Sequence, residues 1–288
     1  MNIIVGENIG FCFGVKRAVE GSLYELKQND KKIYCLGELV HNKEVINKLN
    51  KKGIVFVLNI DEVEENSKLI IRAHGADKKI YDKAKQKNIE IVDFTCPLVV
   101  KIHTTVEEYK NKGYFILLIG NKKHPEIIGT LSYCGEKYSI IEKEEELEQT
   151  IEKLLNQKVK NLLVITQTTY SNSKFKNIER KIKEKLSSKI DVVFKNTICN
   201  ATEQRQKETE KLSQKVDLMI IIGGKNSSNT RNLYNISKKY CDSILIESVK
   251  DINIKEVKKY SKIGIMAGTS TSQESIKLVI KKLKKDKS

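Results

Sequence analysis

Three of the six cysteines occupy similar places in the sequence, one in each third of the chain. Cys12 lies in GFCFGVKRA, Cys96 in FTCPLVVKI and Cys199 in TICNATEQR, and each directly precedes a stretch with helical periodicity. A thiolate at the start of a helix is stabilised by the helix dipole and by backbone N–H groups that have no helical partner. Three such thiolates from distant segments could hold zinc, form a redox relay or bind an iron–sulfur cluster.

The cysteine spacing weighs against two of these sites. Zinc ligands usually come in CxxC-like pairs, and a thiol–disulfide relay normally has a resolving cysteine close by. No such pair occurs among the six cysteines. A 4Fe–4S cluster with three cysteine ligands would leave one iron open to bind and reduce a substrate oxygen. From the spacing alone, the alternative is that Cys12, Cys96 and Cys199 are ordinary buried cysteines. We expect buried structural roles for the other three, Cys35, Cys134 and Cys241.

The only two prolines of the chain follow residues that could bind a metal. Pro97 comes directly after Cys96, and Pro125 comes directly after His124. Proline is favoured at the first position of a helix, where its missing N–H costs little. Pro97 therefore predicts a helix with Cys96 at its cap. Pro125 predicts a fixed bend that lets His124 and Glu126 face one ligand.

Short runs rich in Ile, Val and Leu predict strands, each followed by a lysine-rich stretch with helical period. The clearest runs are 31–38, 68–75, 114–121, 161–169, 217–226 and 262–270, two in each third of the chain. Such alternation is typical of α/β folds with mainly parallel sheets.

Polar side chains follow these strands, at the ends where parallel sheets bind ligands. The candidates are His41, His74, His124, Gln167, Thr168, Ser227, Ser228, Asn229 and Ser270. Imidazole, hydroxyl and amide donors, together with N–H groups at helix starts, suit a phosphate or diphosphate. His103 lies inside a helical stretch, and we expect it to be structural.

Glu126 is the candidate proton donor. A carboxyl group near a reducing cluster and an anionic substrate should have a raised pKa, which suits a general acid. Thr168 could relay that proton. The alternatives are that Glu126 complements a helix dipole and that Thr168 caps the next helix.

The net charge of +16 raises nucleic acid as a partner. However, the basic residues are nearly all lysines dispersed along helical stretches, tryptophan is absent and aromatic residues make up 6%. The chain therefore has few aromatic side chains on which bases could stack, and we expect no nucleic-acid partner.

The start of the chain lacks the pattern of a signal peptide, and no apolar run is long enough for a membrane helix. We expect a cytoplasmic protein without a membrane partner.

With these residues in place, the sequence resembles the 4-hydroxy-3-methylbut-2-enyl diphosphate reductases, the last enzymes of the non-mevalonate isoprenoid route. The resemblance runs over the whole chain and is specific as a set. It rests on GFCFGV, VHN, AHG, DFTCPLV, HPEIIGT, TQTT, ICNATEQRQ, GGKNSSNT and AGTST, in this order.

The resemblance implies three α/β domains in a pseudo-threefold trefoil around a 4Fe–4S cluster bound by Cys12, Cys96 and Cys199. We place these domains at 1–95, 96–195 and 196–288. It also implies removal of the allylic hydroxyl as water, giving isopentenyl and dimethylallyl diphosphate with two electrons and two protons. The open iron would bind the substrate's hydroxyl oxygen.

The resemblance assigns further roles to single residues. Glu126 would deliver the proton with help from Thr168 and His124. The diphosphate would be bound by His41, His74, His124, Ser227, Ser228, Asn229 and Ser270, with Gln167 nearby. Flavodoxin or ferredoxin would supply the electrons, for which a basic face offers a landing site. A non-catalytic iron–sulfur binding or sensor protein is the alternative function.

Overall fold

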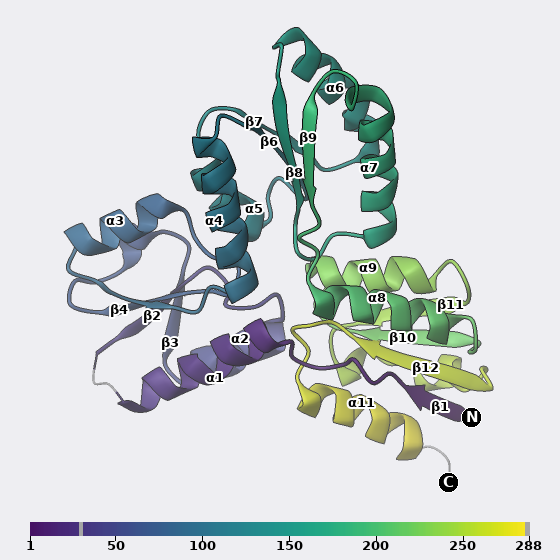
Figure 1. The fold of residues 1–288 in the computed structure, drawn as a ribbon. Helices are drawn as coiled ribbons and strands as arrows, with labels where there is room; N and C mark the ends of the chain where they lie inside the picture. The colour runs from purple at the N-terminus through teal and green to yellow at the C-terminus, as the bar shows by residue number, and fades with distance from the viewer. Residues whose placement is uncertain (29–30, 286–288) are drawn as a thin grey trace. The chain divides into compact units, whose positions relative to one another are not determined.

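The computed structural model describes residues 1–28 and 31–285. Its strands form three sheets of four strands each, and every strand pair with a described register is parallel (Figure 1). Helices alternate with the strands along the chain. The predicted α/β class with parallel sheets is therefore confirmed.

The first sheet combines the N-terminal strand with three strands from the last third of the chain. In spatial order it contains β1 (Asn2–Val5), β12 (Lys262–Ala267), β10 (Leu218–Ile222) and β11 (Asp242–Ile246). One face is covered by α11 (Gln273–Lys285), and the other by α8 (Asn200–Ser213) and α9 (Ser228–Ser237) (Figure 1). Ile276, Val279 and Leu283 of α11 are buried against the sheet, because they recur at helical spacing on one side.

The second sheet contains, in spatial order, β3 (Ile54–Val57), β2 (Ile33–Leu36), β4 (Lys68–Ile71) and β5 (Glu90–Asp93). The helix α3 (Lys78–Gln86) packs against β5. The remaining α-helices in this part of the sequence are α1 (Phe13–Gln28) and α2 (Lys43–Lys51).

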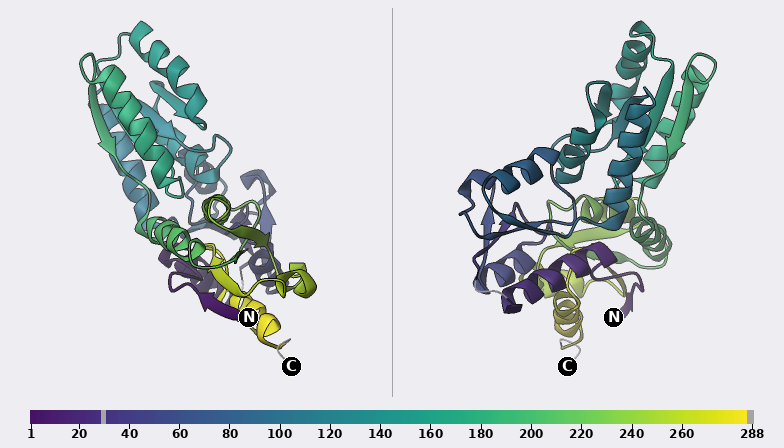
Figure 2. Two further views of the ribbon diagram at one scale, coloured as in Figure 1. Left: turned by 90° about the vertical axis from the view of Figure 1, so that its right-hand side faces the viewer. Right: turned by 60° about the vertical axis from the view of Figure 1, so that its left-hand side comes forward.

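The third sheet contains β7 (Tyr138–Ile141), β6 (Phe115–Ile119), β8 (Asn161–Thr166) and β9 (Asp191–Lys195). The helices α6 (Leu147–Asn156) and α7 (Asn172–Leu186) pack on one face, while α4 (Pro97–Asn111) and α5 (Pro125–Cys134) pack on the other. Figure 2 shows this layering, in teal and green, in two further views. Both faces of the central strands are therefore buried.

The six strands predicted from the sequence are β2, β4, β6, β8, β10 and β12, and they are the two central strands of each sheet. Central parallel strands are buried on both faces, so they appear in the sequence as continuous apolar runs. The edge strands were missed because most of their residues are exposed or only partly buried. The strand β9 is an example, since none of its five residues is fully buried.

The chain divides into two compact units. One contains Met1–Asp30, Glu38–Phe56 and Asn200–Ser288, and the other contains Lys31–Gly37 and Val57–Cys199. The predicted domain ranges 1–95, 96–195 and 196–288, and the threefold arrangement, stay predictions. Among the helices of the described residues, none combines the length and apolar content needed to cross a bilayer.

Candidate active site

In the second unit, the start of α5 and the end of β8 hold a buried carboxylate. Glu126 is only 2% exposed. Its Oε1 accepts a hydrogen bond from the backbone N–H of Thr168 at 2.7 Å, and its Oε2 accepts one from the Thr168 hydroxyl at 2.6 Å. The backbone N–H of Glu126 donates to Nδ1 of His124 at 3.2 Å. Pro125 stands at the first position of α5, between these two residues, and the prediction that both side chains face one ligand stays a prediction.

The burial of Glu126 changes its acid–base chemistry. Removal from water raises the pKa of this carboxyl group to about 7, although both hydrogen bonds from Thr168 act in the opposite direction. The sequence also predicts a raised pKa for Glu126, but from a nearby cluster and an anionic substrate. In the structure the cause is burial of the carboxyl group within the protein. A group with a pKa near neutrality can both hold and release a proton under working conditions.

His124 takes part in this arrangement as a neutral ring. Its Nδ1 accepts the hydrogen bond from Glu126, which assigns the ring proton to Nε2. The ring centroid of His124 lies 5.3 Å from that of His74, with the two planes at 87°. His74 follows β4 and His124 precedes α5, so the structure brings together two predicted site residues that are far apart in sequence.

Cys96 and Cys199 are anchored beside these same residues through the main chain. The N–H of Cys96 donates to the carbonyl of Ala73, directly before His74, at 3.0 Å. The N–H of Cys199 donates to the carbonyl of Thr168 at 3.0 Å. Thr168 therefore contacts the buried acid through its N–H and hydroxyl, and it positions a cysteine through its carbonyl.

Cys96 caps α4, with Pro97 at the first helical position as predicted. The backbone N–H groups of Leu98 and Val99 act to lower the pKa of the Cys96 thiol, as expected at a helix start. Burial nevertheless outweighs them and raises this pKa, with smaller contributions in the same direction from Cys199 and Glu126. The N–H groups at the start of α4 are therefore not sufficient to favour the ionised form of Cys96 that the sequence predicted. A bound metal displaces the thiol proton, so the ionised form would depend on the metal.

Gln167 is buried, and its side chain is used within the protein. Its Oε1 accepts a hydrogen bond from the N–H of Asn121 at 3.0 Å, and its Nε2 donates to the Thr169 hydroxyl at 2.7 Å. The first contact secures the loop between β6 and α5, which carries His124. The structure thus places Gln167 as a support for this loop.

In the first unit, two other loops contact the loop that contains His41. The carbonyl of His41 accepts a hydrogen bond from the Ser270 hydroxyl at 3.2 Å. A Cβ atom added to Gly224 would lie 2.2 Å from this carbonyl oxygen, so only glycine allows the loop after β10 to approach this closely. The N–H of Cys12 donates to the carbonyl of Thr269, the residue before Ser270, at 3.1 Å.

The start of α9 carries the remaining predicted polar residues. Ser227 caps the helix by accepting a hydrogen bond from the N–H of Thr230. Asn229 is 1% exposed, and both polar atoms of its amide lack a hydrogen-bond partner among residues 1–28 and 31–285. Buried amides are nearly always paired, so the amide of Asn229 retains the capacity to bind a polar group.

Cys12, Cys96 and Cys199 are the three cysteines predicted from the sequence as ligands of a metal cofactor. All three are half-buried thiols outside any disulfide. Cys12 directly precedes α1, Cys96 caps α4 and Cys199 directly precedes α8. Soft sulfur donors at positions with nearby N–H groups fit an iron–sulfur cluster, whose sulfur atoms also accept hydrogen bonds.

Comparison with known proteins decides the family. The model of the LytB protein family matches residues 3–284. The chain belongs to the LytB family. A relative from Clostridioides difficile (strain 630), named 4-hydroxy-3-methylbut-2-enyl diphosphate reductase, is 41% identical over 283 residues, which cover 97% of this chain and 98% of that protein. A relative of the same name from Aquifex aeolicus (strain VF5) is 38% identical, covering 94% and 92% of the two chains.

Solved structures of LytB-family proteins agree with this assignment. The E-1-hydroxy-2-methyl-but-2-enyl-4-diphosphate reductase from Plasmodium falciparum superposes with a TM-score of 0.90 at 33% identity, covering 98% of this chain and 87% of that chain. A second structure is described as (E)-4-hydroxy-3-methyl-but-2-enyl diphosphate reductase, the terminal enzyme of the non-mevalonate pathway. It has a TM-score of 0.71 at 36% identity, covering 99% of this chain and all of that chain.

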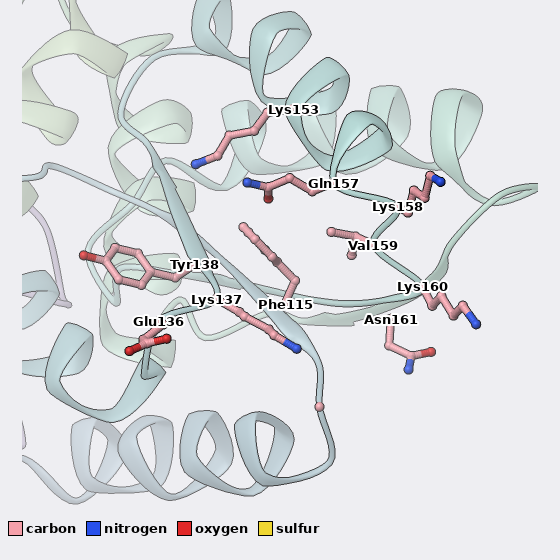
Figure 3. Close-up of a pocket in the computed structure, with 11 residues that line it drawn as sticks. Phe115, Glu136, Lys137, Tyr138, Lys153, Gln157, Lys158, Val159, Lys160 and Asn161 are labelled. Carbon is pink, nitrogen blue, oxygen red and sulfur yellow. The ribbon is translucent and has the colours of Figure 1, made fainter.

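This LytB-family chain also has a surface pocket away from the predicted residues. The pocket has a volume of about 490 Å³ and lies where β6, β7 and β8 begin, at the end of the sheet opposite to the strand exits. Figure 3 shows Phe115 and Tyr138 in the pocket, with Lys153 and Gln157 from the α6 region above them. None of the predicted site residues lines it. We therefore do not assign the family's chemistry to this pocket.

Several residues that contact the predicted site residues of this LytB-family chain could not be identified from the sequence. Ala73 and Thr269 contribute only main-chain carbonyl groups, which every residue has, so no residue pattern identifies them. Gly224 had a weaker signal. It lies in the quoted stretch GGKNSSNT, but a glycine there could equally have served a simple turn.

Proposed function

We propose that this chain reduces (E)-4-hydroxy-3-methylbut-2-enyl diphosphate to isopentenyl and dimethylallyl diphosphate, with loss of water. The reaction takes up two electrons and two protons, and it therefore needs an acid close to the electron source. The contact that carries the proposal is the one between Glu126 and Thr168, because the carbonyl of Thr168 anchors Cys199. The names of the relatives support the same reaction.

The proposed cofactor is a 4Fe–4S cluster with Cys12, Cys96 and Cys199 as ligands. When bound, such a cluster supplies electrons and, at its iron without a cysteine ligand, a Lewis acid for the hydroxyl oxygen of the substrate. The chemistry of the three thiols fits this role, whereas the unpaired spacing of the cysteines does not fit a structural zinc site.

We assign proton delivery to Glu126. Its pKa of about 7 keeps a large share of the carboxyl groups protonated at neutral pH. The Thr168 hydroxyl, 2.6 Å from Oε2, orients the acid and provides a path for the proton. His124 presents Nε2–H as a donor, since its Nδ1 is used by Glu126. In this proposal the leaving hydroxyl departs as water after protonation by Glu126.

We assign substrate binding to two groups of side chains. In the second unit, His74 and His124 supply imidazole donors, and Gln167 supports them. In the first unit the donors are His41, Ser227, Ser228, Asn229 and Ser270. The buried amide of Asn229, which has no hydrogen-bond partner among the residues that the structure describes, is the observation that favours a ligand rich in oxygen atoms, such as a diphosphate.

The remaining parts of the proposal concern partners and location. We propose that flavodoxin or ferredoxin supplies the electrons, because a chain with a net charge of +16 attracts partners with an acidic face. We also propose a cytoplasmic location. Both follow from the family resemblance and the composition.

The experiment that tests the proposal starts with protein purified and reconstituted without oxygen. We expect about four irons and four sulfides per chain, as a 4Fe–4S cluster requires. With a chemical reductant, the loaded protein should convert (E)-4-hydroxy-3-methylbut-2-enyl diphosphate into the two five-carbon diphosphates, detected by mass spectrometry. Iron-loaded protein that leaves this substrate unchanged would contradict the proposed reaction.

Asn229→Asp should weaken substrate binding about a hundredfold, measured as an increase in KM. The change keeps the shape of the side chain but places a carboxylate where we expect the diphosphate, and opposed like charges cost several kcal/mol. Asn235→Asp is the matched control, because Asn235 lies on the same helix at an exposed position. We expect the control to keep the KM of the wild type. Equal KM values for both variants would remove Asn229 from the substrate site.

A further inference from the structure

Arg205 is a buried cation beside the loop that leads to Cys12, and the mechanism above gives it no role. It is 5% exposed and lies on α8, the helix that begins directly after Cys199. Its Nη2 donates to the carbonyl of Gly10 at 2.8 Å, and its Nη1 donates to the carbonyl of Ala201 at 3.0 Å. Gly10 is two residues before one proposed cluster ligand, and Ala201 is two residues after another.

Other contacts in the same unit fix this loop. One turn along α8, the carboxylate of Glu208 accepts hydrogen bonds from the N–H of Glu7 at 2.5 Å and from the N–H and side-chain amide of Asn8, both at 2.9 Å. Gly10 has φ +88°, and a Cβ atom there would lie 2.5 Å from Nε2 of Gln273. The loop is therefore held from two sides, and its glycine cannot be replaced without strain.

Arginine suits this position better than any other side chain. Its planar guanidinium carries five donors in a rigid fork, so one group can bond two separate carbonyls, whereas a lysine ammonium is a point charge on a flexible stem. Hydrogen bonds from a charged group are stronger than neutral ones. Burial of a cation is costly, but a metal-bound thiolate at Cys12, two residues after Gly10, would bring negative charge that this cation offsets.

We propose that Arg205 is a positioning residue for the iron–sulfur cluster. It ties the loop of Cys12 to the first turn of the helix that follows Cys199, and it thereby holds two of the three ligand segments ready for the cluster. The inference rests on the proposed function, because it takes the cluster to be the cofactor of this chain.

The test compares Arg205→Lys and Arg205→Met with the wild type after anaerobic loading. Removal of groups that orient metal ligands typically costs tenfold to a hundredfold in metal affinity. We expect Arg205→Met to release iron to a chelator at least about tenfold faster than the wild type. Arg205→Lys should give an intermediate rate, because it keeps the charge but loses the fork. Loss of the cation should also lower the reduction potential of the cluster in Arg205→Met.

Leu212→Ala is the matched control for a loss of stability. Leu212 is buried on the same helix, in an apolar cluster, and its truncation should leave a cavity that destabilises the protein. Iron release is measured at a temperature at which all iron-free variants remain folded by circular dichroism. We expect the control to release iron at nearly the wild-type rate and to keep the wild-type reduction potential.

The outcomes separate this inference from the proposed function. If loaded Arg205→Met releases iron as slowly as the wild type, or if Leu212→Ala releases it as quickly as Arg205→Met, the positioning role is wrong although the cluster remains. If the wild type itself binds no iron–sulfur cluster, the proposed function fails, and the role of Arg205 fails with it.

Discussion

Glu126→Gln should reduce kcat about 10³-fold while leaving the fold and the cluster in place. General acids typically contribute factors of 10² to 10⁴, and glutamine has no proton to deliver at neutral pH. The substitution preserves the local structure, because the amide oxygen can still accept from the Thr168 N–H and the amide nitrogen can donate to the Thr168 hydroxyl. Steady-state kinetics and iron content measured on the same preparation test this result.

The same substitution should stabilise the protein above neutral pH. Burial raises the pKa of Glu126 from 4.5 to about 7, so the folded state binds this proton more tightly than the unfolded chain. Ionisation therefore costs stability, with no loss below pH 4.5, a growing loss between pH 4.5 and 7, and a constant loss above pH 7. At pH 8 the gain from Glu126→Gln should reach about 3 kcal/mol. Urea unfolding of the iron-free protein at pH 4 and pH 8 measures this difference.

Glu136→Gln is the control for both measurements, since Glu136 is exposed just beyond the same helix. We expect it to keep the activity of the wild type and to gain no stability between pH 4 and pH 8. A Glu126→Gln variant with full activity would remove this residue as the acid. If the loaded wild type carried the cluster but turned over no substrate, a non-catalytic iron–sulfur protein would become the better interpretation.

Replacement of any one of Cys12, Cys96 and Cys199 by alanine should abolish activity and reduce bound iron from about four per chain to nearly none. A cluster bound by only three cysteines already has one iron without a protein ligand. Loss of another cysteine would leave two such irons, so we expect the cluster not to be retained. Anaerobic iron and sulfide analysis after reconstitution, together with the visible absorption of the cluster, measures the effect.

Cys134→Ala and Cys241→Ala are matched controls for these variants. Cys134 is buried in the apolar core between α5 and the third sheet, and Cys241 is partly buried beside the first sheet. We expect both controls to bind the normal amount of iron and to remain active. Full iron content in Cys12→Ala, Cys96→Ala or Cys199→Ala would show that the residue in question is not a ligand.

The central strands of all three sheets could be predicted from the sequence, but their partners at the edges could not. A strand that is buried on both faces needs apolar residues throughout, and this requirement leaves a clear pattern. The strand β1 is an edge strand that the sequence did not predict. It pairs with β12 from the other end of the chain, and no local pattern records which distant edge a short strand will join.

The sequence by itself determined which residues could perform the chemistry. The three cysteines at helix starts, the histidines at strand exits and the two prolines all depend on local rules for helix caps and strand ends, which the residue types satisfy without reference to distant segments. Only the tertiary structure decided how Glu126 meets Thr168, how the main chain of Thr168 anchors Cys199, and that the buried amide of Asn229 has no hydrogen-bond partner within the described part of the chain. Such contacts join main-chain groups or side chains far apart in sequence, and burial, which sets the pKa of Glu126, exists only once those segments have packed together.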